Sequence, residues 1–136
     1  MPSIEAVLET SLYVSDLARS VAFYRSVLGL HLMSEFDDER GAAFAVGPSV
    51  LLLFRAEETS KQRTIPSHGS NGRGHVAFRV SRDEMAAWRK HLDSRGVHIE
   101  LEHSFEGNPP SLFFRDPDGN LLEIAVASIW PWPADA

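Results

Sequence analysis

An internal repeat is the feature of this chain that most restricts its fold. An apolar segment that ends at Val14 returns as a similar segment that ends at Val80, an offset of 66 residues. A helical stripe follows each segment and closes at a glycine, Gly29 in the first copy and Gly96 in the second. Two copies of a unit that leaves one sheet face uncovered can bury that face by pairing, so we expect a curved sheet around a shared cleft.

Each copy is predicted to contain a strand, a helix and then three strands, because periods of two residues indicate strands and steps of three and four indicate a helix. In the first copy the strands are expected at residues 7–14, 31–36, 42–46 and 50–54, and the helix at 17–28. In the second copy the strands are expected at 75–80, 97–101, 112–115 and 121–126, with Met85, Trp88 and Leu92 as the helical stripe. Asp-Pro-Asp-Gly at 116–119 predicts a tight turn, and its carboxylates lack the spacing of a calcium loop.

The elements predict an α+β fold of two tandem β-α-β-β-β modules that form a curved mixed sheet around a cleft. We expect one domain over residues 1–136. Module one is expected at about 5–56, a linker at about 57–73, module two at about 74–127 and a tail at 128–136.

Composition excludes several classes of protein. A chain of 136 residues fits a single domain, and a net charge of -6 disfavours nucleic acid as a partner. No apolar run approaches the roughly 18 residues of a membrane span and no secretory signal is present, so we expect a cytoplasmic protein without a membrane partner. The absence of cysteine excludes disulfides, thiolate catalysis and sulfur-bound zinc. Chemistry is left to histidine, carboxylates, hydroxyls or a bound metal.

Three side chains are the candidates for such chemistry. At the 66-residue offset Glu9 coincides with His75, so both should lie on the same side of equivalent strands. Glu123 interrupts the apolar run 121–125, where an unpaired buried carboxylate would be costly. Each of the three has an ordinary alternative: a solvated strand-edge carboxylate for Glu9, a hydrogen-bonded strand histidine for His75, and an outward-pointing side chain for Glu123.

Three strings resemble the vicinal-oxygen-chelate superfamily, which includes glyoxalases, bleomycin-resistance proteins and ring-cleaving dioxygenases. The strings are SDLARSVAFYRSVLGL at 15–30, GHVAFRV at 74–80 and FRDPDGNLLEIA at 114–125. They are similar, in this order, to the first helix, the opening strand of the second module and the closing hairpin of that family. The resemblance covers nearly the whole chain.

The resemblance implies a divalent-metal site. The family's ligand positions correspond to Glu9, His75, Glu123 and a fourth position near Leu52, where this chain has no ligand. A set of two carboxylates and one imidazole suits Mn, Fe, Co, Ni or Zn, with the remaining positions left to water or substrate. Either Glu9 or Glu123 would also act as a catalytic base.

The resemblance further implies a metal-dependent lyase or isomerase that acts on a small substrate with neighbouring oxygens. Ring-cleaving dioxygenases and fosfomycin-resistance thiol transferases of the family use two histidines and one glutamate, so Glu9 disfavours both. Glyoxalase-like lyases accept a glutamate at the first position. The alternatives are a dioxygenase-like iron enzyme and a metal-free drug-binding module of the bleomycin-resistance type.

Three further residues are candidates for substrate binding. Arg115 carries a guanidinium that matches a carboxylate, although it flanks a turn where structural hydrogen bonds are usual. His68 lies in the glycine-rich linker, where it is either exposed or part of a lid, and Phe113 is an aromatic side chain that could line a cleft. Trp130 and Trp132 in the tail are either a loose end or a hydrophobic strap. We expect a homodimer, because a single module of this size buries too little surface alone.

Overall fold

The computed structural model describes residues 1–61, 65–70 and 72–134. Residues 62–64 and 71 of the predicted linker, and 135–136 of the predicted tail, lie outside the described residues. The chain divides into two compact units, Met1–Gly74 and His75–Ala136, which we call the first and second modules. Each is described by itself.

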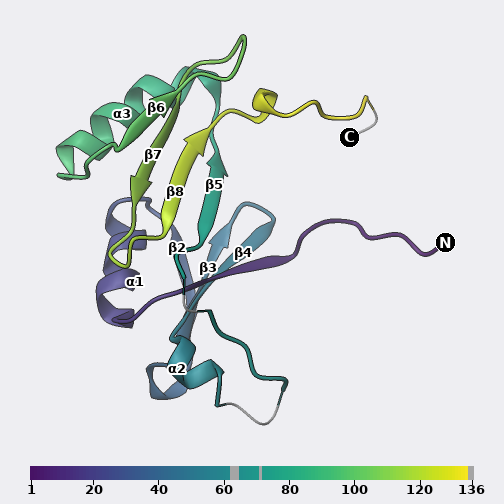
Figure 1. Ribbon diagram of the computed structural model, residues 1–136, viewed down its shortest axis with the longest axis vertical. Coiled ribbons are helices and arrows are strands. Elements are labelled where there is room, and N and C mark those ends of the chain that lie inside the picture. Colours follow the sequence, from purple (N-terminus) through teal and green to yellow (C-terminus); the bar gives the residue numbers. More distant parts are fainter. Residues whose placement is uncertain (62–64, 71, 135–136) are drawn as a thin grey trace. The chain divides into compact units, whose positions relative to one another are not determined.

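The first module contains one four-stranded sheet and a helix between its first two strands (Figure 1). Its elements are β1 (Glu9–Tyr13), α1 (Leu17–Ser26), β2 (His31–Glu35), β3 (Gly41–Val46) and β4 (Ser49–Phe54). The strand order is β1-β4-β3-β2. The first and last strands are parallel, and the other pairs are antiparallel.

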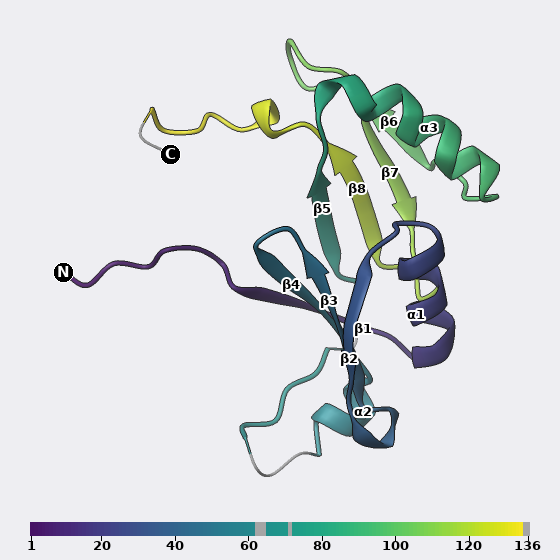
Figure 2. The ribbon, with the colours of Figure 1, turned by 180° about the vertical axis from the view of Figure 1, so that it is seen from behind.

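The second module repeats this arrangement, as Figure 2 shows from behind. Its elements are β5 (His75–Arg79), α3 (Met85–Ser94), β6 (Leu101–His103), β7 (Ser111–Arg115) and β8 (Leu121–Ala125). The order β5-β8-β7-β6, with β5 parallel to β8, reproduces that of the first sheet. The predicted α+β fold of two β-α-β-β-β modules is therefore confirmed, with one mixed sheet in each module.

Both helices are fixed by local signals and by their buried stripes. Asp16 caps α1, because its side chain accepts a hydrogen bond from the backbone nitrogen of Arg19 at 3.0 Å. After the C-terminus of α3, Gly96 has a φ of 69° and its backbone nitrogen donates to the Asp93 oxygen, while the nitrogen of Val97 donates to the Leu92 oxygen. This pair of bonds is a Schellman motif, which needs a left-handed residue and so favours glycine. The buried stripes of α1 and α3 comprise Leu17, Val21 and Tyr24, and Met85 and Leu92.

The Schellman motif also explains where a prediction was too early. A strand was expected at 97–101, but β6 covers only Leu101–His103. The backbone nitrogen of Val97 is still occupied by the helix end, at 2.9 Å from the Leu92 oxygen. The pairing with β7 starts only at Glu100, whose nitrogen lies 2.7 Å from the Phe113 oxygen.

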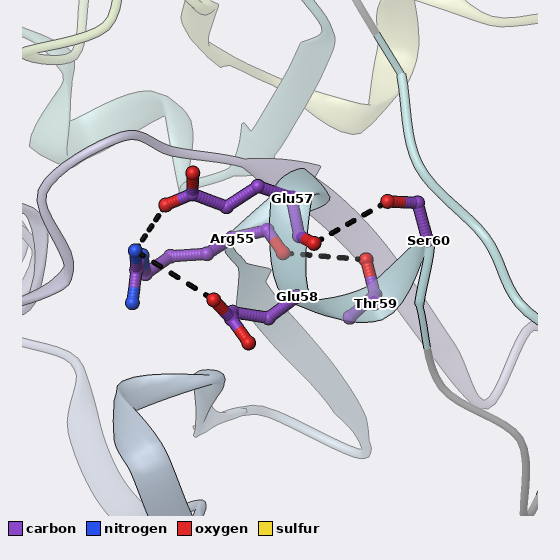
Figure 3. A network of polar contacts seen from close by, with 5 residues as sticks. All are labelled: Arg55, Glu57, Glu58, Thr59 and Ser60. Atoms are coloured by element: carbon purple, nitrogen blue, oxygen red, sulfur yellow. Dashed lines mark hydrogen bonds and ion pairs between the residues drawn. The ribbon is translucent and has the colours of Figure 1, made fainter.

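A short helix that the sequence did not reveal, α2 (Ala56–Thr59), begins at the end of the predicted first module and runs into the predicted linker. Four residues are too few for a helical period to be recognised in the sequence. In the structure the helix is held by local polar contacts (Figure 3). The guanidinium of Arg55 contacts the carboxylates of Glu57 and Glu58. The hydroxyls of Thr59 and Ser60 each donate to a backbone oxygen one turn earlier, at 3.4 Å.

The predicted turn at 116–119 is present and is held by the side chain of Asp116. Its carboxylate accepts from the backbone nitrogens of Asp118 and Asn120, and from the Asn120 side chain, each at 2.9 Å. Gly119 has a φ of 83° and donates to the Asp116 backbone oxygen at 3.0 Å. Asp116 and Asn120 are both buried. The turn thereby fixes the residue at which β8 begins.

No helix among the described residues has the length and apolar character needed to cross a membrane.

Candidate functional site

One face of the second sheet carries the predicted site residues. Side chains alternate along a strand, and residues paired across two strands share a face. Glu123 is paired with Ala77 on β5 and with Phe113 on β7, and His75 is paired with Leu121. We call this the site face; it carries His75, Ala77 and Arg79 of β5, Glu123 and Ala125 of β8, and Phe113 and Arg115 of β7. The opposite face carries Leu122 and Ile124 and packs against α3.

His75 is oriented by the backbone of β8. Its Nδ1 lies 2.9 Å from the backbone oxygen of Leu121. Because a carbonyl oxygen only accepts, Nδ1 is the protonated nitrogen and donates this bond. In the neutral ring the lone pair is therefore on Nε2, which lies 3.4 Å from Oε1 of Glu123. A histidine held by its other ring nitrogen in this way is the usual state of a metal ligand.

Glu123 is buried and only partly satisfied. The residue is 5% exposed, in the middle strand of the sheet. Its Oε1 contacts His75, but Oε2 is buried without a hydrogen-bond partner among the described residues. Leaving such an acceptor unpaired costs about 1 to 3 kcal/mol, and more for a charged group. The outward-pointing alternative for Glu123 is thereby excluded, and its carboxylate needs a cation or a proton.

The pair fits a metal ion in its chemistry and its spacing. Two ligand bonds of about 2.0 to 2.2 Å to one ion can span an N–O separation of 3.4 Å. An imidazole lone pair and a carboxylate oxygen are both acceptors, so a cation between them removes their mutual repulsion. Within residues 1–61, 65–70 and 72–134, however, no three His, Asp or Glu side chains gather as a ready-made metal site. The pair supplies two ligands, and others must come from elsewhere.

The first module has the same backbone positions with different side chains. Ser11 is paired with Leu52 just as Ala77 is paired with Glu123, and Glu9 and His75 each lie two residues before that pair. Glu9 is thus the counterpart of His75, and Leu52 is the counterpart of Glu123. Glu9 is exposed at the start of β1, whereas Leu52 is only 8% exposed. The expectation that Glu9 and His75 lie on equivalent faces agrees with these registers.

The three predicted substrate-binding residues differ in their surroundings. The Phe113 ring stacks at 21° to the His75 ring, with centroids 6.5 Å apart, so it borders the pair. The Arg115 guanidinium donates to Glu100 at 3.0 and 3.2 Å and to the backbone oxygen of Gly119 at 3.0 Å. Its hydrogen bonds are therefore structural, as the position beside a turn suggested.

His68 is held in the first module and is half-buried. Its Nδ1 lies 2.6 Å from the hydroxyl of Tyr13, and its ring packs edge-on to Phe54 with centroids 4.8 Å apart. These contacts tie the linker to the ends of β1 and β4.

Sequence reasoning missed two groups on the site face. The backbone oxygen of Leu121 orients His75, and no sequence signal could reveal it, because it depends on the register of β5 and β8. Arg79 was also overlooked. Arg79 lies two residues after Ala77 and four after His75 on the same strand. Because side chains alternate along a strand, this spacing was a signal that Arg79 shares the face of His75.

Comparisons with known proteins agree with the fold and identify the family. The model of the Glyoxalase/Bleomycin resistance protein/Dioxygenase superfamily matches residues 6–124. The chain is 30% identical to the metallothiol transferase FosB of Bacillus licheniformis, over 86% of this chain and 72% of that protein. It is 31% identical to the glutathione transferase FosA of Serratia marcescens, over 93% and 84%. Its fold is similar to the crystal structure of a lactoylglutathione lyase from Agrobacterium tumefaciens, with a TM-score of 0.89, 31% identity and coverage of 96% and 100%.

The unpaired oxygen of Glu123 makes a prediction about stability. In metal-free protein, Glu123→Met removes a buried charge and keeps the volume, so the free energy of unfolding should rise by about 1 to 3 kcal/mol. Urea-induced unfolding in EDTA measures this change. Glu106→Met, which replaces an exposed carboxylate, is the control and should change stability by less than about 0.5 kcal/mol. A Glu123→Met protein no more stable than the native one would show that the carboxylate is already satisfied.

Proposed function

The chain belongs to the glyoxalase/bleomycin resistance protein/dioxygenase superfamily, and on that ground we propose that it is a divalent-metal-dependent lyase or isomerase. In this proposal His75 and Glu123 hold the ion, and Glu9 is the third ligand. The metal is one of Mn, Fe, Co, Ni or Zn, for which a mixed set of imidazole and carboxylate is suitable. The substrate is a small molecule with two neighbouring oxygens. A cytoplasmic location is part of the proposal, in keeping with a chain that has no cysteine to form disulfides.

The observation that carries the proposal is the buried carboxylate oxygen beside an oriented imidazole. A protonated His75 paired with Glu123 is the ordinary alternative, and it would account for Oε1. It would leave Oε2 buried without a hydrogen-bond partner among the residues that the structure describes. A bound ion accounts for both the unpaired oxygen and the Nδ1 bond to Leu121, because that bond leaves Nε2 able to coordinate.

The residues have separate tasks in this reaction. A bound divalent ion would polarise the substrate oxygens and stabilise negative charge that develops on them. Glu123, buried and central in the sheet, is suited to holding the ion. Glu9, the third ligand, is exposed at a strand end and is suited to loosening from the ion, taking a proton from the substrate carbon and returning it to the neighbouring atom. Phe113 borders the pair with an apolar ring that keeps water from one side.

Metal analysis tests the proposal directly. Protein purified without chelators should contain a divalent ion, and isothermal titration should show that His75→Ala or Glu123→Gln weakens its binding by at least about tenfold, because a ligand is lost. His98→Ala, which alters an exposed histidine of the same module, is the control and should bind the ion as the native protein does. If neither native nor variant protein takes up an ion, the proposal is wrong. Ligand binding that persists unchanged in EDTA would then favour the drug-binding alternative.

Thiol transfer to a small substrate is a second candidate, because relatives named metallothiol transferase and glutathione transferase share 30% and 31% identity with this chain. The two candidates differ in the fate of the thiol. A transferase consumes one free thiol for each product molecule, whereas an isomerase changes no thiol count. We expect no net consumption of glutathione when the metal-loaded protein is incubated with it and a small electrophile, measured with a thiol-reactive dye. Stoichiometric consumption that His75→Ala abolishes would favour the transferase instead.

Glu9 belongs to the first module, so the proposal includes a homodimer in which this residue comes from the same chain or from the partner. We expect Glu9→Ala and Glu123→Ala to be inactive singly. If the site is shared between chains, equal mixing of the two variants should restore about a quarter of the native sites, since half of the dimers are mixed and each has one intact site. If the site lies within one chain, mixing restores nothing.

Mixing His75→Ala with Glu123→Ala is the matched control, because both residues lie in the second module and neither arrangement then yields an intact site. Sedimentation of the native protein measures its association. A monomer that retains full metal binding and activity would contradict the dimer.

A further inference from the structure

A hollow lies on the second module, where β5 and β8 end and the tail begins. Its volume is ≈ 310 Å³, near the lower limit of roughly 300 to 1,000 Å³ for small-molecule sites. Its lining includes Ala77, Arg79, Ala125, Ile129, Trp130 and Trp132. Ala77 is paired in register with Glu123, and Ala125 is two residues further along β8. The lining therefore begins at the β5 position level with Glu123 and continues to the tail, although neither Glu123 nor His75 itself lines the hollow.

Small side chains on the strands leave this space open. Ala77 and Ala125 occupy site-face positions between the His75–Glu123 pair and the tail. A leucine or phenylalanine at either position would fill the hollow. Both alanines are methyl-sized, so the floor is apolar and offers no hydrogen bond of its own. Polarity must come from the edges of the hollow.

Arg79 supplies that polarity at one edge. It is the last residue of β5, it is exposed, and it lies on the same face as His75 and Ala77. Its guanidinium makes no ion pair or side-chain hydrogen bond with any residue that the structure describes. Arg115, on the same face, is by contrast fully engaged with Glu100 and Gly119. Arg79 is thus a guanidinium of the site face that is available to an anion.

The tail supplies an aromatic wall. After the short turn Ala127–Ile129, Trp130 and Trp132 line the hollow while remaining 66% and 61% exposed. The position of Trp132 is fixed, because its Nε1 donates to the backbone oxygen of Ala127 at 2.6 Å. Two large rings held at a hollow and left open to solvent provide stacking surfaces for a planar ligand.

We propose that this hollow binds an aromatic carboxylate, with the carboxylate on Arg79 and the ring against Trp130 and Trp132. A guanidinium can bind a carboxylate through two parallel hydrogen bonds, which fixes the direction of the ligand as well as its charge. The substrate class that follows is a small aromatic acid whose reactive oxygens lie toward Glu123. That last step rests on the proposed metal-dependent function, whereas binding in the hollow does not.

Calorimetric titration of the full chain in EDTA tests the binding. The probes are 1-naphthoate and the neutral 1-naphthamide, which share a ring and differ in charge. We expect the native protein to bind naphthoate at least about tenfold more tightly than naphthamide, the effect of one charge-assisted contact. Arg79→Gln should weaken naphthoate by about tenfold and make the two ligands equal. Arg82→Gln, an equal change of charge in the 3-10 turn Arg82–Glu84, should change neither affinity.

The aromatic wall has its own variants. Trp130→Ala and Trp132→Ala should weaken both ligands, and Ala77→Leu should abolish binding of both by filling the hollow. Trp88→Phe, on α3, is the control and should have no effect. Absence of naphthoate binding to native protein, equal affinity for the acid and the amide, or an Arg79→Gln protein that keeps the preference would overturn the proposal.

One variant separates this inference from the proposed function. His75→Ala should leave naphthoate affinity in EDTA unchanged while weakening metal binding. Naphthoate binding without any metal binding by the native protein would support the hollow and contradict the metalloenzyme. Metal binding with no naphthoate binding would do the reverse.

Discussion

In each module the first strand lies beside the last and parallel to it, and the site depends on the register of that pairing. In the second module the register places His75 opposite Leu121 and Ala77 opposite Glu123. The same ladder that joins the strands therefore presents the Leu121 oxygen to Nδ1 of His75 and brings Nε2 to the Glu123 carboxylate. A slip of one residue along β8 would turn Glu123 into the core beneath α3 and place Leu122 on the site face. The buried turn at Asp116, which fixes the start of β8, is thus part of the site although it touches no reacting atom.

The two modules share this backbone but differ in chemistry. The position that holds Glu123 in the second sheet holds Leu52 in the first, so of the two sheets only the second carries a buried carboxylate among the residues that the structure describes. A buried leucine stabilises the fold by removing apolar surface from water, whereas Glu123 has one oxygen with no hydrogen-bond partner in the described part of the chain, which costs free energy of folding. The second module therefore carries His75 and Glu123 of the proposed site, whereas the first carries Glu9 at the start of β1. A duplicated fold can divide stability and function in this way because equivalent positions need not have equivalent side chains.

Sequence patterns predicted the two modules and most of the strands, because these depend on period alone. They also predicted that Glu9 and His75 occupy equivalent positions in the two modules, because this depends on the 66-residue offset. They also singled out Glu123, because a carboxylate within an apolar run has few explanations. The short helix at Ala56–Thr59 was missed, since four residues show no period. The start of β6 was predicted too early, because the backbone nitrogen of Val97 donates to Leu92 at the end of α3 and not to a neighbouring strand. Arg79 could have been found from the alternation of side chains along one strand, whereas the role of the Leu121 oxygen depends on which residues face one another across two strands. Such relations follow from register, which one sequence does not contain.

Relatives with transferase and lyase names share almost the same identity with this chain, so overall similarity does not decide between the reactions. The charge of the ligand set is more informative. With Glu9 as the third ligand, two carboxylates would neutralise a divalent ion, whereas a set of two histidines and one carboxylate would leave it a net positive charge. A neutral centre attracts an anionic substrate weakly, so recognition of an anion would have to come from another cation. Arg79, available on the same face and next to the hollow, is such a group. The proposed metal set and the proposed carboxylate site are therefore complementary: the first polarises neighbouring oxygens, and the second supplies the charge that draws an acidic substrate to them.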